Sequence, residues 1–265
     1  MGFDMLLAID AGNSNITVGC VDGGGARCVF RMASDIKKTE FEYASAMKNI
    51  FEFNDIDCGG LTGAAVSSVV PPLTHTFARA ARMLCGADAV VVGAGIKTGL
   101  NILIDDPAQL GSDMVAAAVA ARAMYEPPVI VVDMGTATKL FVVTENAGFI
   151  GGAIYPGVSL SMDALSRGTA QLPGVPIEAP KKCISANTID CMKSGAIFGS
   201  ASMIDGMCER FERELGRKAS VVATGGLAGE IYAHCTRKII YEPNLVLLGL
   251  AIIYEKNRKN SKAFP

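Results

Sequence analysis

Two short segments of this chain share one pattern, and they lie about half a chain length apart. The first is an apolar run that ends at Asp10 and Gly12, and the second is an apolar run that ends at Asp133 and Gly135. A run rich in β-branched residues follows each of them. A strand–turn–strand unit that occurs twice in 265 residues predicts two similar α/β domains, one in each half of the chain, facing each other across a cleft.

The composition of these turns suits phosphate and metal binding. Glycine lets a ligand approach the backbone closely because it has no Cβ. Backbone amides and the short side chains of Asn13, Ser14 and Thr136 can donate to phosphate oxygens, and an aspartate can hold Mg²⁺ directly or through water. The alternative is an ordinary hairpin turn with glycine at a strained position. Two copies at half-chain spacing favour the phosphate site.

The overall composition excludes some classes of partner and cofactor. Half of the residues are hydrophobic and the net charge is only −2, so nucleic acid and membrane surfaces are not expected as partners. The eight cysteines contain no CxxC pair, and no apolar run reaches transmembrane length. These features predict a soluble cytoplasmic protein with reduced thiols. The two histidines, His75 and His234, are expected to be structural, which makes a carboxylate the better candidate for a general base.

Hydrophobic periodicity and turn residues predict alternating strands and helices. Strands are expected at 5–9, 16–21, 28–32, 63–70, 89–92, 129–133, 140–144, 149–154 and 220–224. Helices are expected at 39–53, from 71 to about 86, from 112, at 158–166, at 188–215 and at 245–254. This order predicts an α/β fold with a first domain over 1–115 and a second over 116–265.

Further motifs strengthen the case for a nucleotide-dependent enzyme. They are an acidic segment at a helix start (105–113), a glycine-punctuated strand end (151–157), a helix end (166–173) and a glycine pair after a buried strand (223–228). Each one alone is an ordinary turn, but their order and spacing are specific. The sequence resembles the type III pantothenate kinases of the acetate kinase/sugar kinase/Hsp70/actin superfamily. The matching segments are IDAGNSN, DPAQLGSD, DMGTAT, GGAIYPG, TAQLP, NTIDCMKSGAIFG, ATGGLA and PNLVLLGL.

The resemblance implies a fold, an activity and a set of partners. The fold would be two duplicated ribonuclease-H-like (actin-like ATPase) domains around an ATP cleft. The protein would be a homodimer with its pantothenate pocket near the subunit interface. It would transfer phosphate from ATP to the primary hydroxyl of pantothenate, giving 4'-phosphopantothenate in the first step of coenzyme A biosynthesis. Its cofactors would be Mg²⁺ and a monovalent cation, K⁺ or NH₄⁺.

The resemblance also assigns roles to individual residues. Asp113 would be the catalytic base, and Asp133 would ligate the monovalent cation. Asp10 would lie near Mg²⁺, which it would hold through phosphate or water. ATP would contact Asp10, Gly12, Asn13, Ser14, Asn15, Thr136, Gly225 and Gly226. The pantothenate side would comprise Ile104, Gly111, Ser112, Asp113, Met114 and Thr188.

The chain departs from the family pattern mainly on the acceptor side. Met114 stands where the family has an arginine, and Ile104 stands where a tyrosine is common. An arginine that orients an anionic substrate is commonly worth about 1.5–3 kcal/mol, and a thioether cannot replace it. Lys139 and Phe141 stand where threonine and often aspartate occur. Lys139 could supply the missing positive charge, although a solvated strand residue is the preferred interpretation.

Three functions remain open from the sequence. The first is a pantothenate kinase with a repacked acceptor site. The second is a kinase of the same fold that acts on another small alcohol. The third is a non-catalytic paralogue with a regulatory or accessory role. The retained Asp10, Asp113, Asp133 and Thr188 favour the first.

Overall fold

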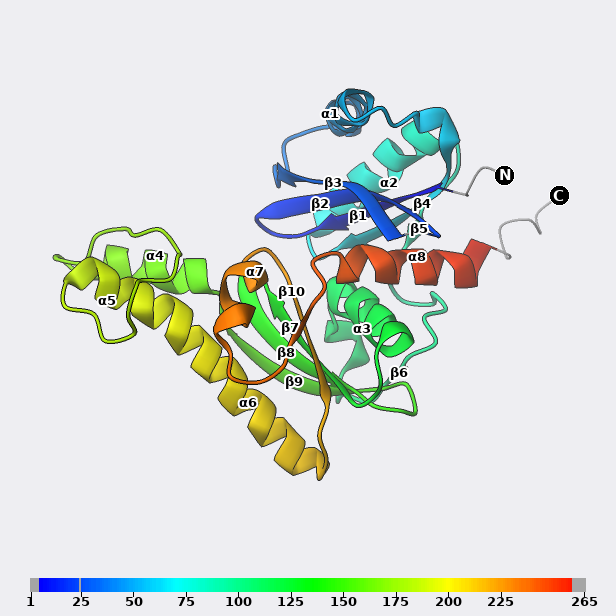
Figure 1. Ribbon diagram of the computed structural model, residues 1–265. Helices are drawn as coiled ribbons and strands as arrows, with labels where there is room; N and C mark the ends of the chain where they lie inside the picture. The colour runs from blue at the N-terminus through cyan, green and yellow to red at the C-terminus, as the bar shows by residue number, and fades with distance from the viewer. Residues whose placement is uncertain (1–4, 24, 259–265) are drawn as a thin grey trace. The chain divides into compact units, whose positions relative to one another are not determined.

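The computed structural model describes residues 5–23 and 25–258 and divides into two compact units. Unit 1 contains the chain up to residue 100, residues 105–123 and the chain from residue 244 onward. Unit 2 contains residues 101–104 and 124–243. Each unit is built on its own β-sheet, with helices packed on the sheet (Figure 1).

Unit 1 contains a five-stranded sheet in the order β3-β2-β1-β4-β5. Its first three strands form an antiparallel meander, whereas β4 and β5 run parallel to β1. The strands are β1 (Met5–Ala11), β2 (Asn15–Asp22), β3 (Gly25–Ala33), β4 (Leu61–Ser68) and β5 (Val90–Val91). The helices are α1 (Glu40–Phe53), α2 (Pro71–Cys85), α3 (Ser112–Met124) and α8 (Leu245–Asn257).

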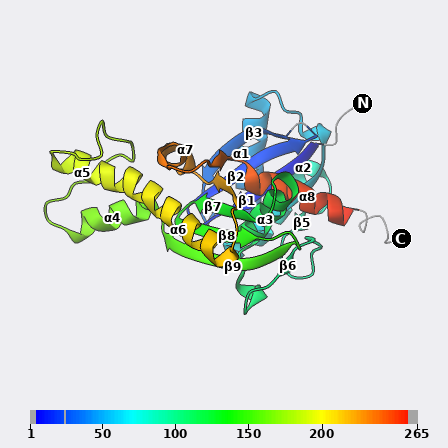
Figure 2. The ribbon, with the colours of Figure 1, turned by 60° about the horizontal axis from the view of Figure 1, so that its bottom comes forward.

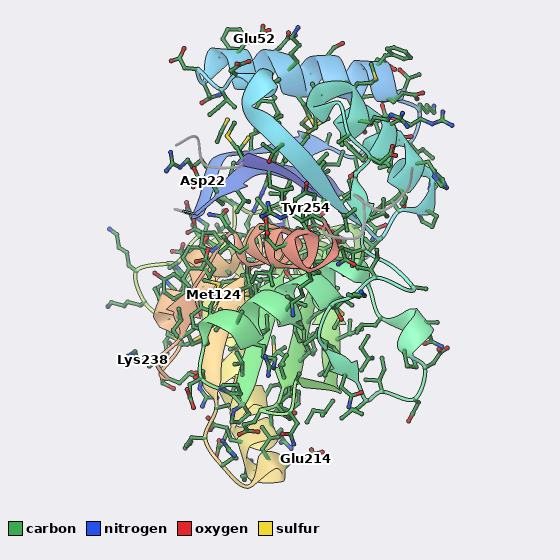
Figure 3. The ribbon with its side chains drawn as sticks, turned by 90° about the vertical axis from the view of Figure 1, so that its right-hand side faces the viewer. Asp22, Glu52, Met124, Glu214, Lys238 and Tyr254 are labelled. Carbon is green, nitrogen blue, oxygen red and sulfur yellow. The ribbon has the colours of Figure 1, made fainter. Side chains whose placement is uncertain are left out.

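Helices cover both faces of this sheet (Figure 1). Leu7 and Ile9 of β1 lie in a core cluster with residues of α1 and α2. The alternate residues Leu6 and Ala8 point to the other face, on which α8 packs. Tyr254 of α8, labelled in Figure 3, donates its hydroxyl to the Thr62 carbonyl over 3.4 Å. The C-terminal helix is therefore part of the fold of unit 1.

Unit 2 contains a six-stranded sheet in the order β11-β10-β7-β8-β9-β6. Its core cluster joins one face of this sheet to α4, α6 and α7. The strands are β6 (Asn101–Ile102), β7 (Val129–Met134), β8 (Ala137–Val143), β9 (Gly148–Pro156), β10 (Ser220–Thr224) and β11 (Ile240–Tyr241). The helices are α4 (Val158–Gly168), α5 (Thr188–Ser194), α6 (Ser200–Leu215) and α7 (Ala228–Ile231).

Five strands of the unit 2 sheet repeat the topology of the unit 1 sheet, and β6 is an addition. Read in reverse, the order β9-β8-β7-β10-β11 in unit 2 corresponds to β3-β2-β1-β4-β5 in unit 1. Both series contain two antiparallel pairings followed by two parallel pairings. The predicted α/β fold with two duplicated domains is confirmed.

The structure differs from the sequence-based expectation in several details, of which three follow. The predicted division into 1–115 and 116–265 is simpler than the observed one, because α3 and α8 both belong to unit 1. The helix expected at 188–215 contains a π-helical turn at Gly195–Gly199 between α5 and α6. The two-residue strands β6 and β11 were not expected, since two residues carry no periodicity. Within residues 5–23 and 25–258, no helix has both the length and the apolar character needed to cross a membrane.

Candidate active site

The first predicted phosphate turn connects β1 to β2 in unit 1. The Gly12 amide donates to the Asn15 carbonyl over 3.0 Å, which closes the turn. Ser34, the residue directly after β3, holds the turn: its hydroxyl donates to the Gly12 carbonyl (2.5 Å) and its amide donates to the Ser14 carbonyl (3.1 Å). Asn13, Ser14 and Asn15 are exposed. The turn is thus fixed through its backbone while its side chains stay accessible to a ligand.

Two serines connect this turn to the start of α3. Asp10 lies opposite Ser67 in the parallel pairing of β1 with β4. The Ser67 and Ser112 hydroxyls are 2.9 Å apart, and the Ser112 hydroxyl also accepts from the Ser68 amide (3.0 Å) and lies 3.0 Å from the Ser68 carbonyl. The structure therefore brings Asp10 and the first turn of α3 to the carboxyl end of the same two strands. Ligands of open α/β sheets bind at this end of parallel strands.

Asp113 occupies the first turn of α3. Its Oδ1 accepts a hydrogen bond of 2.8 Å from the Met114 amide, and the carboxylate lies over Gly111, where an added Cβ would be 2.5 Å from Oδ1. A carboxylate near a helix N-terminus is favoured by the helix dipole. Asp113 is partly buried, as are Gly111, Ser112 and Met114. The predicted base is thus held by its own helix, at the carboxyl end of β1 and β4, where Asp10 also lies.

The Ser112 hydroxyl is engaged with β4, so we expect it to position α3. Replacing Ser112 by alanine should lower the free energy of unfolding by about 1–2 kcal/mol, because Ser67, which is fully buried, loses a hydrogen-bond partner. Urea denaturation would measure this change. Ser45→Ala, at an exposed position of α1, is the control and should change stability by no more than about 0.5 kcal/mol. Equal effects of the two substitutions would contradict the positioning role.

The second predicted turn connects β7 to β8 in unit 2, and its aspartate is part of an ion pair. Asp133 lies directly opposite Lys139 in the antiparallel pairing, and the Lys139 Nζ is 2.8 Å from the Asp133 Oδ2. The Lys139 and Asp133 side chains are only 16% and 14% exposed. The expectation that Lys139 is a solvated strand residue is therefore wrong. Its ammonium contacts the carboxylate that was predicted to bind a monovalent cation.

The glycine pair after β10 lies against this second turn. Gly225 has a φ of +95°, and a Cβ at this position would lie 2.6 Å from the Met134 nitrogen. Only glycine allows the backbone directly after β10 to approach Met134 so closely in this conformation. The structure thus brings Asp133, Thr136, Gly225 and Gly226 together within unit 2. Thr136 and Gly226 are exposed.

Three further residues that the sequence analysis singled out, Ile104, Phe141 and Thr188, belong to unit 2. Thr188 is the exposed first residue of α5, and Figures 1 and 2 show α4 and α5 beyond the end of the unit 2 sheet. Ile104 belongs to unit 2, where its Cγ2 lies 3.8 Å from the position of a Cβ on Gly151, whereas Gly111 and Met114 belong to unit 1. Phe141 is fully buried and stacks on Phe149 at 5.2 Å between ring centroids. Phe141 is thus a core residue of unit 2.

Sequence reasoning missed Ser34 and Ser67, which hold the site together. Both are small polar residues, Ser34 directly after β3 and Ser67 near the end of β4, and neither stands in a motif. Ser67 has one recognisable signal, because it is a polar residue directly after the apolar run 64–66 and before Pro71. Such a residue needs a hydrogen-bond partner when it is buried. The identity of the partner depends on the parallel pairing of β1 with β4, which no local pattern gives.

Comparison with known proteins identifies the family. A sequence profile described as type III pantothenate kinase matches residues 6–210. The chain belongs to the type III pantothenate kinase family. A type III pantothenate kinase of Moorella thermoacetica is 39% identical over 255 residues, which cover 96% of this chain and 100% of the relative. One of Roseiflexus castenholzii is 42% identical, with the same coverage of both chains. The resemblance found in the motifs is confirmed.

Solved structures with little sequence similarity share the fold. Component A of (R)-2-hydroxyglutaryl-CoA dehydratase from Acidaminococcus fermentans superimposes with a TM-score of 0.53 at 14% identity. The match covers 97% of this chain and 99% of the other. This similarity concerns the fold alone.

Proposed function

We propose that this chain transfers the γ-phosphoryl group of ATP to the primary hydroxyl of pantothenate, giving 4'-phosphopantothenate, the first step of coenzyme A biosynthesis. Membership of the family supports the substrate pair. The structural observation that carries the proposal is that Asp10 and Asp113 both lie at the carboxyl end of β1 and β4. The hydrogen bonds of Ser112 to Ser67 and Ser68 bring the start of α3, and with it Asp113, to this end. Phosphoryl transfer needs a metal ligand and a proton acceptor close together.

The residues of unit 1 fit the roles of metal ligand and base. Asp10 is a partly buried carboxylate beside an exposed polar turn, and carboxylates are preferred ligands of Mg²⁺. Asp10 would hold the ion directly or through water, and Mg²⁺ would neutralise charge on the ATP phosphates. Asp113 would accept the hydroxyl proton as the new O–P bond forms and the bond from the γ-phosphorus to the ADP oxygen breaks. Because the transition state is loose, positioning and charge matter more than the strength of this base.

The two turns and the glycine pair would bind the nucleotide. The exposed polar residues of the first turn, Asn13, Ser14 and Asn15, would donate to the phosphates. In unit 2, Thr136 would contact ATP, and the backbone at Gly225 and Gly226 would border the base or ribose. Asp133 was predicted to bind a monovalent cation, but its carboxylate already contacts the Lys139 ammonium.

The acceptor side would use Gly111, Met114, Ile104 and Thr188. Ser112 would contribute indirectly, by positioning α3, because its hydroxyl is hydrogen-bonded to Ser67 and Ser68. Met114 and Ile104 offer no charge to the pantothenate carboxylate. We therefore expect a higher KM for pantothenate than an arginine at position 114 would give, by about tenfold for each 1.4 kcal/mol of lost interaction.

We also propose that the chain forms a homodimer and works in the cytoplasm. Several apolar side chains of unit 2 are exposed, in β9, in the first turn of α4 and before α5. They include Ile154 (72% exposed), Leu160 (52%) and Ile184 (92%). Exposed apolar side chains of this size favour burial against another protein surface. A second copy of the chain is the partner that the family resemblance suggests.

An ADP-release assay tests the proposed function. The protein is supplied with MgATP, with and without pantothenate, and ADP formation is followed by a coupled reaction. We expect release that depends on pantothenate. Release that another small alcohol stimulates, with no response to pantothenate, would favour a kinase of different specificity. ATP binding without turnover on any alcohol would favour a non-catalytic role.

A further inference from the structure

The ion pair between Lys139 and Asp133 lies where a free cation was expected. The two residues are direct neighbours across β7 and β8, so their side chains project from the same face of the sheet. The Nζ to Oδ2 distance of 2.8 Å is that of a charge-assisted hydrogen bond. Both side chains are less than one-fifth exposed. The contact is thus a partly buried ion pair that the pairing register holds in place.

The duplicated turn in unit 1 provides an internal comparison. There, the residue directly opposite Asp10 is the neutral Thr17. The corresponding residue opposite Asp133 is the cationic Lys139. The same strand–turn–strand unit thus places a carboxylate opposite a hydroxyl-bearing residue in unit 1 and opposite an ammonium-bearing residue in unit 2. The difference is specific to the second turn and does not follow from the fold.

The cross-strand neighbours of the ion pair add no charge of their own. Thr224 of β10 lies opposite Asp133 on one side, and Ile154 of β9 lies opposite Lys139 on the other. Neither of these neighbours is charged. A K⁺ ion bound to Asp133 would therefore face the like charge of the Lys139 ammonium across one shared carboxylate. The residues present do not fit a bound monovalent cation at this position.

We infer that the Lys139 ammonium takes the place of the monovalent cation at Asp133, so that this chain works without K⁺ or NH₄⁺. The lysine ammonium carries one positive charge and three donors, as a compact cation would. Tethering it to β8 keeps that charge in place at any salt composition. The inference about activity rests on the proposed function, whereas the occupancy of Asp133 does not.

Cation binding is tested first without any assay of activity. The melting temperature of the wild-type protein is measured in about 100 mM KCl and in choline chloride of equal ionic strength, so that screening is the same. A ligand that binds only the folded state raises the melting temperature. We expect no difference for the wild type and a higher value in KCl for Lys139→Thr, whose Asp133 can accept the ion. A wild-type melting temperature that rises in KCl would overturn the inference.

Two further variants complete this measurement. Lys193→Thr removes a lysine of similar exposure (14%) from another ion pair, with Glu178, and its melting temperature should not respond to K⁺. The double variant Lys139→Thr/Asp133→Asn should lose the response that Lys139→Thr gains. A folded Lys139→Thr protein without any response to K⁺ would show that no cation site underlies the ion pair. If Lys139→Thr does not fold, the wild-type comparison and Lys139→Arg, which should also ignore K⁺, decide the question.

The activity assay separates this inference from the proposed function. Pantothenate-dependent ADP release by the wild type should differ by less than about twofold between the two salts. Lys139→Thr should lose at least about tenfold in choline chloride and recover most of that loss in KCl. Tenfold activation of the wild type by K⁺ would overturn the inference and leave the kinase in place. Absence of turnover in both salts would remove the proposed function, while the melting temperatures would still decide the occupancy of Asp133.

Discussion

Replacing Asp113 by asparagine is expected to lower kcat for pantothenate phosphorylation by about 10²- to 10⁴-fold. Asparagine keeps the size of the side chain and an oxygen that can accept from the Met114 amide, so the local geometry should persist. It cannot accept the hydroxyl proton. Steady-state kinetics with MgATP and pantothenate would measure the change, together with urea denaturation to follow stability.

The competing explanation is that Asp113 only stabilises α3. A first-turn acid interacts with the helix dipole, and its neutralisation costs about 0.3–1 kcal/mol of stability without affecting chemistry. Glu40→Gln is the matched control, because Glu40 is a first-turn acid of α1 in the same unit. It should retain kcat within about twofold. If Asp113→Asn behaves like this control, Asp113 is not the base.

Replacing Gly249 by alanine is expected to produce the largest loss of stability, about 3 kcal/mol. Gly249 lies in the middle of α8, and an added Cβ would lie 1.9 Å from the Ala116 carbonyl oxygen and 2.5 Å from its carbon. Both groups are backbone, so no side chain can rotate away. Helices α3 and α8 would have to separate. Because α3 carries Asp113, kcat should fall along with the midpoint of urea denaturation.

Gly206 provides the control for this substitution. It lies within α6, and a Cβ there would meet nothing within 4 Å. Gly206→Ala should be neutral or should stabilise the protein by up to about 1 kcal/mol, because alanine favours the helix. A Gly249→Ala protein as stable as Gly206→Ala would show that α3 and α8 are not held at the described spacing.

Much of the fold could be predicted from the sequence because its signals are local. The turns after Asp10 and Asp133 follow apolar strands and contain glycine, and the helix expected from Pro71 to about Gly86 has proline near its start and glycine at its end. Such signals depend on a few consecutive residues. The place of α8 in unit 1 could not be predicted in this way. It depends on contacts with strands more than 170 positions earlier in the chain.

The candidate site was predictable in its motifs but not in its contacts. The pairing of Lys139 with Asp133 depends on the register of β7 and β8, which a loop longer by one residue would change. The hydrogen bonds of Ser112 depend on the arrival of α3 beside the end of β4. Both contacts alter the roles assigned from sequence. One gives Asp133 a cation from within the chain, and the other makes Ser112 a residue that positions α3.

The return of the chain from unit 2 to α8 has a consequence for synthesis on the ribosome. Helix α8 is translated after every strand of both sheets, yet it covers the face of the first sheet that carries Leu6 and Ala8. All strands and helices assigned wholly to unit 2 lie between residues 101 and 243, so this unit is complete in the nascent chain before unit 1. The part of unit 1 that emerges first therefore lacks the helix that covers this sheet face until α8 has been translated. That order reverses the usual N-terminal-first folding of domains during synthesis.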